Sequence, residues 1–437
     1  MTRAGAQPME FGESGPLRGT AAVPGDKSIS HRALMLAAMA RGRSRIEGLC
    51  AGTDVLATAG ALRAMGVGIA RAGEAWAVDG VGTGCLLQPE AALDMGNSGT
   101  AARLLMGLAA SHPIRAVFVG DASLCRRPMT RVIAPLGRLG AEIVASPGGR
   151  LPLALRGLCP AIPAAHRLTI ASAQVKSSLL FAALNIPGTT RIVQAVPTRD
   201  HSERLLKRFG ADIAVGGGEI ALGGEAELAP QQISIPGDAS AAAFLIVAAL
   251  VVPGSALRIE GVGVNPLRTG LIRLLREMGG DVVVSGERDQ GGEPVADIEA
   301  RHSALRAVDV PPALIPAMID EFPIFFVAAA FAQGTSRATG LAELRVKESD
   351  RIGAMAAGLR AIGASVEESD DGLVIRGSGG EPLAGGATIA SELDHRVAMA
   401  FAVAGLHCAK PVTVDDMGPV ATSFPAFAAT LRGLAAA

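Results

Sequence analysis

The sequence contains an internal repeat, and this repeat constrains the possible folds more than any other feature. The segment PGDKS at Pro24–Ser28 has a counterpart, PGDAS, at Pro236–Ser240. Each copy continues into an apolar stretch, then into Arg-Ile-Glu-Gly, and then into an amphipathic stretch that ends in Met-Gly. Self-similarity over such a distance indicates duplication of a folding unit, so we expect two halves of similar structure.

A shorter unit recurs within each half. It consists of a small or polar start, an Ala-rich helix, a Gly turn, a β-branched strand and a second helix that ends at Gly. Starts of the first helix are expected at Lys27, Ser98, Ala173, Asp238, Asp320 and Asp394. Alternating helices and strands are typical of an α/β protein, and six units in two halves is the simplest count.

The expected helix starts carry side chains that cap free backbone N–H groups, and Asp26 and Asp238 occupy the same place in the two copies. Free N–H groups and the helix dipole attract anions to a helix N-terminus. A fold that gathers several of these starts in one place would therefore form an anion site.

The composition excludes several classes of protein. Lysine and arginine (40) balance aspartate and glutamate (41), and aromatic residues make up only 3% of the chain. Nucleic-acid binding needs positive charge and stacking rings, so neither nucleic acid nor a membrane surface is an expected partner. The apolar runs are too short to span a membrane, and no signal peptide is expected at the start. Five cysteines without metal-ligand spacing suggest a reduced, cytoplasmic protein.

Comparison of the two copies also distinguishes residues that the fold requires from residues that a ligand site could require. Lys27 stands opposite Ala239 and Arg32 opposite Phe244, so the fold itself does not require these two cations. They are candidates for a ligand site, although solvated surface charges are the alternative. Further polar helix starts, around Asn97, Ser172, Arg126 and Arg199, are each weak signals alone, because Ser and Arg are common there.

The second half adds carboxylates to the cations. Asp320-Glu321 precedes an apolar run, Arg345–Arg351 holds five charges, and Asp394-His395-Arg396 directly precedes another apolar run. Helix caps and solvated helix starts remain the alternative interpretation. Because many cations occur together with two or three carboxylates, and no metal-ligand or Ser-His-Asp pattern is present, we expect chemistry on anions with acid and base groups. The absence of GxxxxGK[ST] argues against a Walker-type nucleotide site.

The ordered motifs identify a family. They are GDKSISHR (25–32), GNSGTAAR (96–103), RRPM (126–129), SAQVKSS (172–178), RDHSE (199–203), DEFP (320–323), RVKESDR (345–351), DHRVAM (394–399) and TSFP (422–425). In this order the sequence resembles 5-enolpyruvylshikimate-3-phosphate synthase, the enolpyruvyl transferase of the shikimate pathway. SAQVK and RDHSE resemble its class II branch.

The resemblance implies an α/β fold of two similar domains, each built from three βαβαββ-type repeats as an inside-out α/β barrel, with the active site in the interdomain cleft. The implied domains are 1–23 with 237–437, and the inserted 24–236. The implied reaction transfers the carboxyvinyl group of phosphoenolpyruvate to the 5-hydroxyl of shikimate 3-phosphate and releases phosphate. It belongs to chorismate and aromatic amino acid biosynthesis and is the target of glyphosate. No metal or organic cofactor is implied, and we expect a cytoplasmic monomer.

The resemblance also implies roles for individual residues. Asp320 would take the proton of the 5-hydroxyl, and Glu348 or Lys27 would protonate the methylene carbon. Shikimate 3-phosphate would be bound by Lys27, Ser28, Arg32, Ser172, Ala173, Gln174, Arg199, Asp320 and Lys347. Phosphoenolpyruvate would be bound by Lys27, Asn97, Gly99, Arg127, Gln174, Arg351 and Arg396.

Departures from the family pattern and two alternatives remain. Thr422 stands where many members have Lys, and Ala173 where others have a second Ser. Cys125 would suit the loop cysteine of the sister transferase that acts on UDP-N-acetylglucosamine, but SAQVK, RVKESDR and DHR favour the shikimate branch. A non-catalytic repeat scaffold that binds anionic partners is the second alternative, and it predicts no role for Asp320 or Glu348.

Overall fold

The computed structural model describes residues 5–435. The chain forms two compact units. The terminal unit comprises the chain up to Pro24, Pro236–Asp289, and the chain from Pro294 onward, and the inserted unit comprises Gly25–Ile235 and Gln290–Glu293. The sequence-based assignment placed the segment 290–293 with the rest of its half. The structure groups this segment with the inserted unit, where the buried Glu293 side chain lies 2.7 Å from Nδ1 of His201.

The inserted unit contains three sheets with one shared pattern. Their strand orders are β14-β3-β5-β4, β6-β7-β9-β8 and β10-β11-β13-β12, and in each the first pair is parallel and the other two pairs are antiparallel. The strands are β3 (Arg41–Glu47), β4 (Gly68–Ala72), β5 (Ala75–Val81), β6 (Leu93–Asp94), β7 (Arg115–Val119), β8 (Glu142–Ser146), β9 (Arg150–Arg156), β10 (Ala165–Leu168), β11 (Thr189–Gln194), β12 (Ile213–Gly216), β13 (Glu219–Gly223) and β14 (Gln232–Ser234). Repetition of this topology confirms that the half is built from three copies of one unit.

Each of these sheets has one buried face and one solvent face. In β9 the side chains of Leu151, Leu153 and Leu155 are buried, whereas the residues between them are exposed. This alternation places the leucines on the side of the helices, as expected for a sheet with one solvated face.

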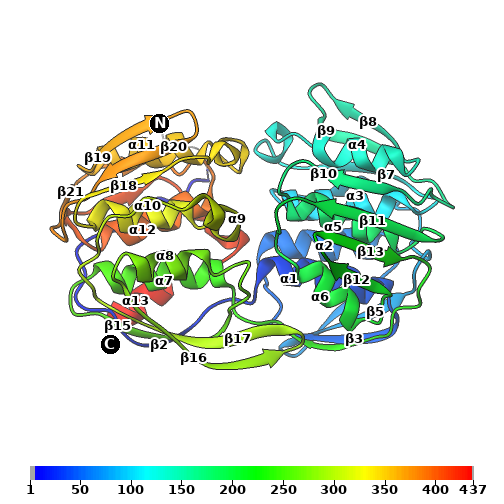
Figure 1. The fold of residues 1–437 in the computed structure, drawn as a ribbon, viewed down its shortest axis with the longest axis horizontal. Coiled ribbons are helices and arrows are strands. Elements are labelled where there is room, and N and C mark those ends of the chain that lie inside the picture. The colour runs from blue at the N-terminus through cyan, green and yellow to red at the C-terminus, as the bar shows by residue number, and fades with distance from the viewer. Residues whose placement is uncertain (1–4, 436–437) are drawn as a thin grey trace. The chain divides into compact units, whose positions relative to one another are not determined.

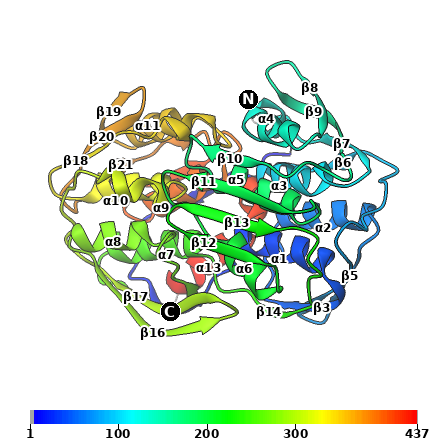
Figure 2. The same cartoon turned by 45° about the vertical axis from the view of Figure 1, so that its right-hand side comes forward.

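The helices of the inserted unit fall into two kinds. They are α1 (Lys27–Met39), α2 (Thr53–Ala64), α3 (Gly99–Ala110), α4 (Thr130–Arg138), α5 (Ala173–Ala183) and α6 (His201–Arg208), with the 3-10 helix η1 (Leu124–Arg126). α1, α3 and α5 are buried over most of their length, and α2, α4 and α6 keep one exposed face. Helices that are buried over most of their surface must be covered by other elements, so α1, α3 and α5 run inside the unit and the sheets lie outside them (Figures 1 and 2).

The terminal unit follows the same plan less regularly. Its sheets are β16-β17-β15-β2, β18-β20-β19, β22-β24-β1 and β21-β23. Its strands are β1 (Met9–Phe11), β2 (Arg18–Ala22), β15 (Ala256–Gly263), β16 (Asp281–Gln290), β17 (Glu293–Arg301), β18 (Thr335–Ala338), β19 (Ser365–Ser369), β20 (Gly372–Arg376), β21 (Leu383–Gly385), β22 (Thr388–Ile389), β23 (Cys408–Lys410) and β24 (Val412–Val414). The sixth unit has two small sheets instead of one, and β1 from the start of the chain completes the larger of them.

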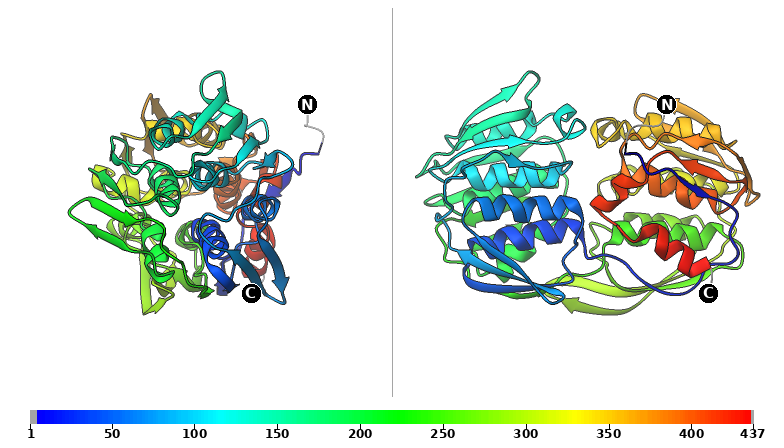
Figure 3. Two further views of the ribbon diagram at one scale, coloured as in Figure 1. Left: turned by 90° about the vertical axis from the view of Figure 1, so that its right-hand side faces the viewer. Right: turned by 180° about the vertical axis from the view of Figure 1, so that it is seen from behind.

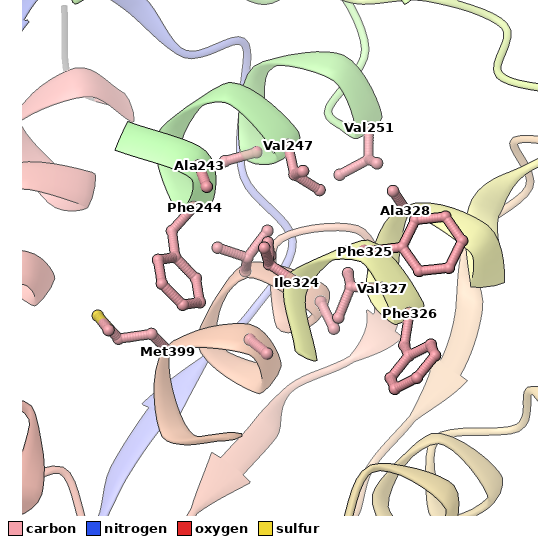
Figure 4. Close-up of a cluster of buried hydrophobic side chains, with 14 of the residues drawn as sticks. Ala243, Phe244, Val247, Val251, Ile324, Phe325, Phe326, Val327, Ala328 and Met399 are labelled. Carbon is pink, nitrogen blue, oxygen red and sulfur yellow. The ribbon is translucent and has the colours of Figure 1, made fainter. Parts of the chain in front are cut away.

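The core of the terminal unit is formed by three buried helices. Its helices are α7 (Ala239–Val251), α8 (Gly270–Glu277), α9 (Ile315–Met318), α10 (Phe322–Phe331), α11 (Arg351–Ala361), α12 (His395–Gly405) and α13 (Phe427–Ala435), with the 3-10 helices η2 (Pro312–Leu314), η3 (Ala342–Val346) and η4 (Gly418–Thr422). Phe244 of α7, Ile324 of α10 and Met399 of α12 belong to one buried cluster (Figure 4). Almost every residue of α7, α10 and α12 is buried, so these helices lie in the interior of the unit; they are the green, yellow and orange helices of Figure 3.

Five of the six predicted helix starts are confirmed by the structure. The predicted positions coincide with the N-cap or the first residue of α1, α3, α5, α7 and α12. Asp26 and Asp238 are both N-caps, since their side chains accept hydrogen bonds from the backbone N–H of Ile29 and Ser240 at 2.9 and 2.7 Å. α10 differs, because Glu321 and not Asp320 is its N-cap.

The second helix of most units ends at the expected glycine. Gly66, Gly140, Gly210, Gly279 and Gly363 follow α2, α4, α6, α8 and α11, and all five have a positive φ. Only glycine adopts this conformation without a steric penalty, so these positions stop the helix and turn the chain into the next strand.

Two further observations concern the whole described chain. In the range 5–435, no helix combines the length and the apolar character that a membrane crossing requires. All five cysteines are free thiols, and Cys50 and Cys408 are buried.

Buried histidines make the fold sensitive to acid. Burial is the main cause that lowers the pKa of His31, His112 and His166 below the ordinary value. Near pH 6.5 and below, these sites bind protons in the unfolded chain before they do so in the fold. Their contribution to stability is therefore complete above that pH and is lost as the pH falls toward the lowered values.

We expect the urea concentration at the unfolding midpoint to decrease as the pH is lowered from about 7.5 to about 5.5. Each histidine should lower the free energy of unfolding by at most about 1.4 kcal/mol per pH unit. His166 is the best site for a test, because neither of its ring nitrogens has a hydrogen-bond partner among the described residues. A His166→Phe variant should lose less stability over this range than the wild type. An equal loss in both proteins would contradict the assignment.

Candidate active site

Three helix N-termini of the inserted unit lie close together. Gln174, in the first turn of α5, donates from Nε2 to Oγ1 of Thr100, in the first turn of α3, at 3.0 Å. Arg32 of α1 donates from Nη2 to Oγ of Ser177 of α5 at 2.8 Å. The three helices therefore begin at the same end of the unit, where their dipoles favour bound anions.

Lys27, the first residue of α1, is held by an ion pair that the sequence did not reveal. Its Nζ lies 2.9 Å from Oδ2 of Asp54, and the two side chains are 15% and 10% exposed. Asp54 belongs to the first turn of α2, where a carboxylate is favoured by the helix dipole. In the sequence, only its place at a helix start points to Asp54, because the contact with Lys27 depends on the packing of α2 beside α1.

The Arg32 guanidinium is buried at the same end. Its Nη1 donates to the backbone oxygen of Ser28 at 2.8 Å. Burial, together with the nearby charge of Arg199, lowers the pKa of Arg32 to about 10. Cationic side chains therefore lie close together near the start of α1, where they suit the binding of a phosphate or a carboxylate.

A second group of predicted residues surrounds the start of α3. Arg127 donates from Nη1 to the backbone oxygen of Asn97 at 3.1 Å, and from Nη2 to Oδ1 of the same residue. Oε1 of Gln174 accepts from Nη1 of Arg103 at 2.8 Å. Of the residues around the start of α3, Arg103 has no role assigned from the sequence, although it belongs to the GNSGTAAR motif.

Gly99 leaves the space that these guanidinium groups use. A Cβ atom at this position would lie 2.8 Å from Nη1 of Arg103 and 3.3 Å from Nη1 of Arg127. The first distance is too short for a carbon–nitrogen contact, so any larger residue must push Arg103 aside. The glycine thus allows two cations to approach the N-terminus of α3.

The terminal unit also gathers helix N-termini, through Glu321. Ser240, in the first turn of α7, donates from Oγ to the Glu321 carboxylate, which precedes α10. Arg396, in the first turn of α12, lies with Nη1 3.5 Å from Oε1 of Glu321. Nη1 of Arg396 also donates to the backbone oxygen of Asp320 at 2.8 Å. Glu321 was read from the sequence only as part of a motif, yet it links the starts of three helices.

Arg351 is the centre of the charged group in this unit. Its guanidinium is 1% exposed and donates to Oδ2 of Asp394 and to Oε2 of Glu348, both at 2.7 Å. Nη1 lies 3.5 Å from Oδ1 of Asp320, and Nζ of Lys347 lies 3.3 Å from the same oxygen. Burial alone would lower the pKa of Arg351, but the surrounding carboxylates raise it above its ordinary value. This arginine is therefore a permanent cation that holds the two predicted acid and base residues near each other.

The predicted site residues thus form three groups within the two units. In the terminal unit the group is Asp320, Lys347, Glu348, Arg351 and Arg396. In the inserted unit one group is Lys27, Ser28, Arg32 and Arg199, and the other is Asn97, Gly99, Arg127 and Gln174, with Ser172 and Ala173 at the start of α5. Within the described residues, no group of His, Cys, Asp and Glu side chains could hold a metal ion.

The fold can be compared with solved structures. The EPSP synthase from Acinetobacter baumannii superimposes with a TM-score of 0.87 at 42% sequence identity, over 98% of both chains. The enolpyruvyl transferase NikO from Streptomyces tendae superimposes with a TM-score of 0.81 at 20% identity, also over 98% of both chains. The likeness to NikO concerns the fold alone. The chain therefore has the α/β fold of the enolpyruvyl transferases, as expected from its motifs.

Sequence comparison is more specific. The family model for EPSP synthase (3-phosphoshikimate 1-carboxyvinyltransferase) matches residues 12–431. The 3-phosphoshikimate 1-carboxyvinyltransferase of Sphingopyxis alaskensis is 62% identical over 99% of this chain and 100% of the relative, and that of Novosphingobium aromaticivorans is 57% identical over 98% and 99%. The chain belongs to the EPSP synthase family.

Proposed function

We propose that this protein transfers the carboxyvinyl group of phosphoenolpyruvate to the 5-hydroxyl of shikimate 3-phosphate and releases inorganic phosphate. The observation that best supports this reaction is the grouping of Asp320 and Glu348 around the buried Arg351, in a chain of this family. Transfer to a hydroxyl needs a base for its proton and an acid for the methylene carbon, and this group offers two carboxylates.

Shikimate 3-phosphate is expected to bind through groups from both units. In the inserted unit these are Lys27, Ser28, Arg32, Ser172, Ala173, Gln174 and Arg199. In the terminal unit they are Asp320 and Lys347. The arginines suit the phosphate because a guanidinium can donate two parallel hydrogen bonds to it.

Phosphoenolpyruvate is expected to bind to a second set of cations. This set is Lys27, Asn97, Gly99, Arg127, Gln174, Arg351 and Arg396. A carboxylate and a phosphate on one small molecule require several positive charges, and the N-terminus of α3 adds backbone N–H donors. Thr422 lies in η4 and donates to the backbone oxygen of Pro419 at 2.8 Å, so a short hydroxyl occupies this place instead of a cationic side chain.

The chemistry proceeds in two steps. Asp320 accepts the proton of the 5-hydroxyl while the hydroxyl oxygen bonds to C2 of phosphoenolpyruvate. Glu348 or Lys27 donates a proton to C3. The group that protonated C3 then takes a proton back from C3 of the tetrahedral intermediate, the bond from C2 to the phosphate oxygen breaks, and phosphate leaves. Fixed cations stabilise the anionic groups of the intermediate without reorganisation during the reaction.

The remaining expectations concern the state of the protein in the cell. We expect a cytoplasmic monomer that needs no metal or organic cofactor and binds no nucleic acid. The nearly balanced charge and the scarcity of aromatic residues support the last of these expectations.

The function is tested by measuring phosphate release from phosphoenolpyruvate with and without shikimate 3-phosphate. We expect release only when both substrates are present. Release that ignores shikimate 3-phosphate but responds to UDP-N-acetylglucosamine would overturn the proposal in favour of the sister transferase.

Substitution of Gly99 tests the phosphoenolpyruvate group. In Gly99→Ala, the added methyl displaces the ends of Arg103 and Arg127. We expect the KM for phosphoenolpyruvate to rise about tenfold, as for the loss of one charged hydrogen bond, with a smaller change in the KM for shikimate 3-phosphate. Steady-state kinetics with one substrate varied at a time provide the measurement.

Gly60→Ala is the matched control. Gly60 also lies in a helix of the inserted unit, and a Cβ atom there would meet nothing within 4 Å. Both KM values should stay at the wild-type level in this variant. If both glycine variants raise the KM for phosphoenolpyruvate equally, the assignment of Gly99 is wrong.

A further inference from the structure

α5 and α6 are joined by two adjacent polar pairs inside the inserted unit. Oγ of Ser177 and Oγ of Ser202 form a hydrogen bond of 2.7 Å. One residue earlier on α5 and one later on α6, Nζ of Lys176 lies 2.6 Å from Oε1 of Glu203. All four side chains are buried, and Lys176 is 0% exposed. We call these four residues the α5–α6 clamp.

The clamp holds the Arg32 guanidinium directly. Nε of Arg32 donates to Oγ of Ser202 at 2.7 Å, and Nη2 donates to Oγ of Ser177 at 2.8 Å. The bond from Nη1 to the backbone of Ser28 is the third that Arg32 donates to described residues. Since a guanidinium has five N–H groups, two remain for a ligand, and the plane of the group is set by the two serines.

The charged pair of the clamp also fixes the segment before α6. Nζ of Lys176 donates to the backbone oxygen of Thr198 at 3.1 Å, and Thr198 directly precedes Arg199. One buried ammonium group thus connects α5, α6 and the backbone beside Arg199. Ordinary packing does not require this arrangement, because apolar residues of similar volume generally stabilise a core as well as a buried ion pair does.

The electrostatics agree with a role toward an anion. Burial lowers the pKa of Lys176, while Glu203 opposes this effect. Burial is the main cause that lowers the pKa of Arg32, the charge of Arg199 adds to this effect, and nearby carboxylates such as Glu203 oppose it. Two neighbouring cations, of which Arg32 is buried and Arg199 is half-buried, are stabilised when an anionic group binds near them.

We propose that the α5–α6 clamp is a positioning element, in which Ser177 and Ser202 orient Arg32 and the Lys176–Glu203 pair fixes the backbone beside Arg199, so that both arginines bind the anionic groups of shikimate 3-phosphate. This role rests on the proposed function. Neither the serines nor the charged pair need to touch the substrate.

The direct test uses Ser202→Ala and Ser177→Ala. Loss of one charged hydrogen bond to Arg32 should raise the KM for shikimate 3-phosphate about tenfold, while kcat and the KM for phosphoenolpyruvate stay within about twofold. Melting temperatures of both variants are measured in parallel. A KM for shikimate 3-phosphate that does not change in either variant would overturn the proposal.

Leu206→Ala is the matched control for the helix. Leu206 is a buried residue of α6 that packs in the apolar core and makes no polar contact through its side chain. This variant should lower the melting temperature and leave both KM values unchanged at a temperature where the protein is folded. If it raises the KM for shikimate 3-phosphate as much as Ser202→Ala does, the effect is one of general stability, and the proposal fails.

The charged pair is tested by Lys176→Met, which leaves the Glu203 carboxylate buried without its cation and is expected to lower the melting temperature. The double variant Lys176→Met/Glu203→Met removes both charges and replaces the ion pair with an apolar contact. Because the bond to Thr198 is still missing, the KM for shikimate 3-phosphate should remain raised in the double variant. A wild-type KM in the double variant would show that the pair is only structural.

Different results would overturn the proposed function and the role of the α5–α6 clamp. A wild-type protein that neither binds shikimate 3-phosphate nor releases phosphate in its presence would overturn the proposed function and, with it, the role of the clamp. An active wild type with unaffected clamp variants would overturn the role of the clamp alone.

Discussion

Asp320→Asn is expected to reduce kcat by about 10²- to 10⁴-fold, the usual contribution of a positioned general base. The amide has almost the size of the carboxylate but cannot accept the proton of the 5-hydroxyl. The carboxylate lies 3.3 Å from Nζ of Lys347 and 3.5 Å from Nη1 of Arg351, so it is held by two cations instead of acting as a helix cap. Steady-state phosphate release with saturating substrates provides the measurement.

Asp309→Asn is the control for this prediction. Asp309 belongs to the same unit and also pairs with an arginine, at 3.5 Å from Arg337, but its side chain is 72% exposed. This variant should keep the wild-type kcat. An Asp320→Asn enzyme that keeps kcat within about threefold would exclude Asp320 as the base and would favour a binding role.

Arg351→Met is expected to have the largest effect on stability. It removes the guanidinium that donates to both oxygens of Asp394, and it leaves this 0% exposed carboxylate to the hydroxyl of Ser349 and the backbone N–H of Arg396. Breaking one side of a buried ion pair typically costs about 3–5 kcal/mol. Because Arg351 also belongs to the proposed phosphoenolpyruvate group, the KM for that substrate should rise by at least about tenfold.

Urea unfolding monitored by circular dichroism measures the loss of stability, and Arg360→Met is the control. Arg360 lies on the same helix, α11, with a 47% exposed side chain 3.6 Å from Glu368. An exposed pair of this kind is worth at most about 1 kcal/mol. Equal destabilisation by the two substitutions would contradict the special position of Arg351.

The repeat and the helix starts could be predicted because they depend on local chemistry. A capping side chain before an apolar run starts a helix wherever it occurs, and Asp26 and Asp238 do so in both copies. The same comparison indicated that Lys27 has a function, because the fold accepts Ala239 at the corresponding place. The form of the sixth unit was not predictable in this way, since β1 reaches it from the other end of the chain.

The site was predictable only where residue type and motif were sufficient. Asp320, Glu348 and Arg351 were assigned from their motifs, and the structure brings them together in the terminal unit. Asp54 and Glu321 were not assigned, although each holds a predicted cation. A carboxylate at a helix start has the same appearance in a sequence whether it caps the helix, meets solvent or pairs with a lysine from another helix.

By itself, the sequence determined the duplicated α/β architecture, the positions of the buried helices and the family, because periodicity, caps and ordered motifs are written along the chain. Only the tertiary structure decided which charges meet. Lys176 belongs to the SAQVKSS motif, but only the packing of α5 against α6 buries it beside Glu203 and brings Ser177 and Ser202 to Arg32. Such pairs join residues from different helices. Their geometry depends on how the helices pack, which a local sequence pattern does not predict.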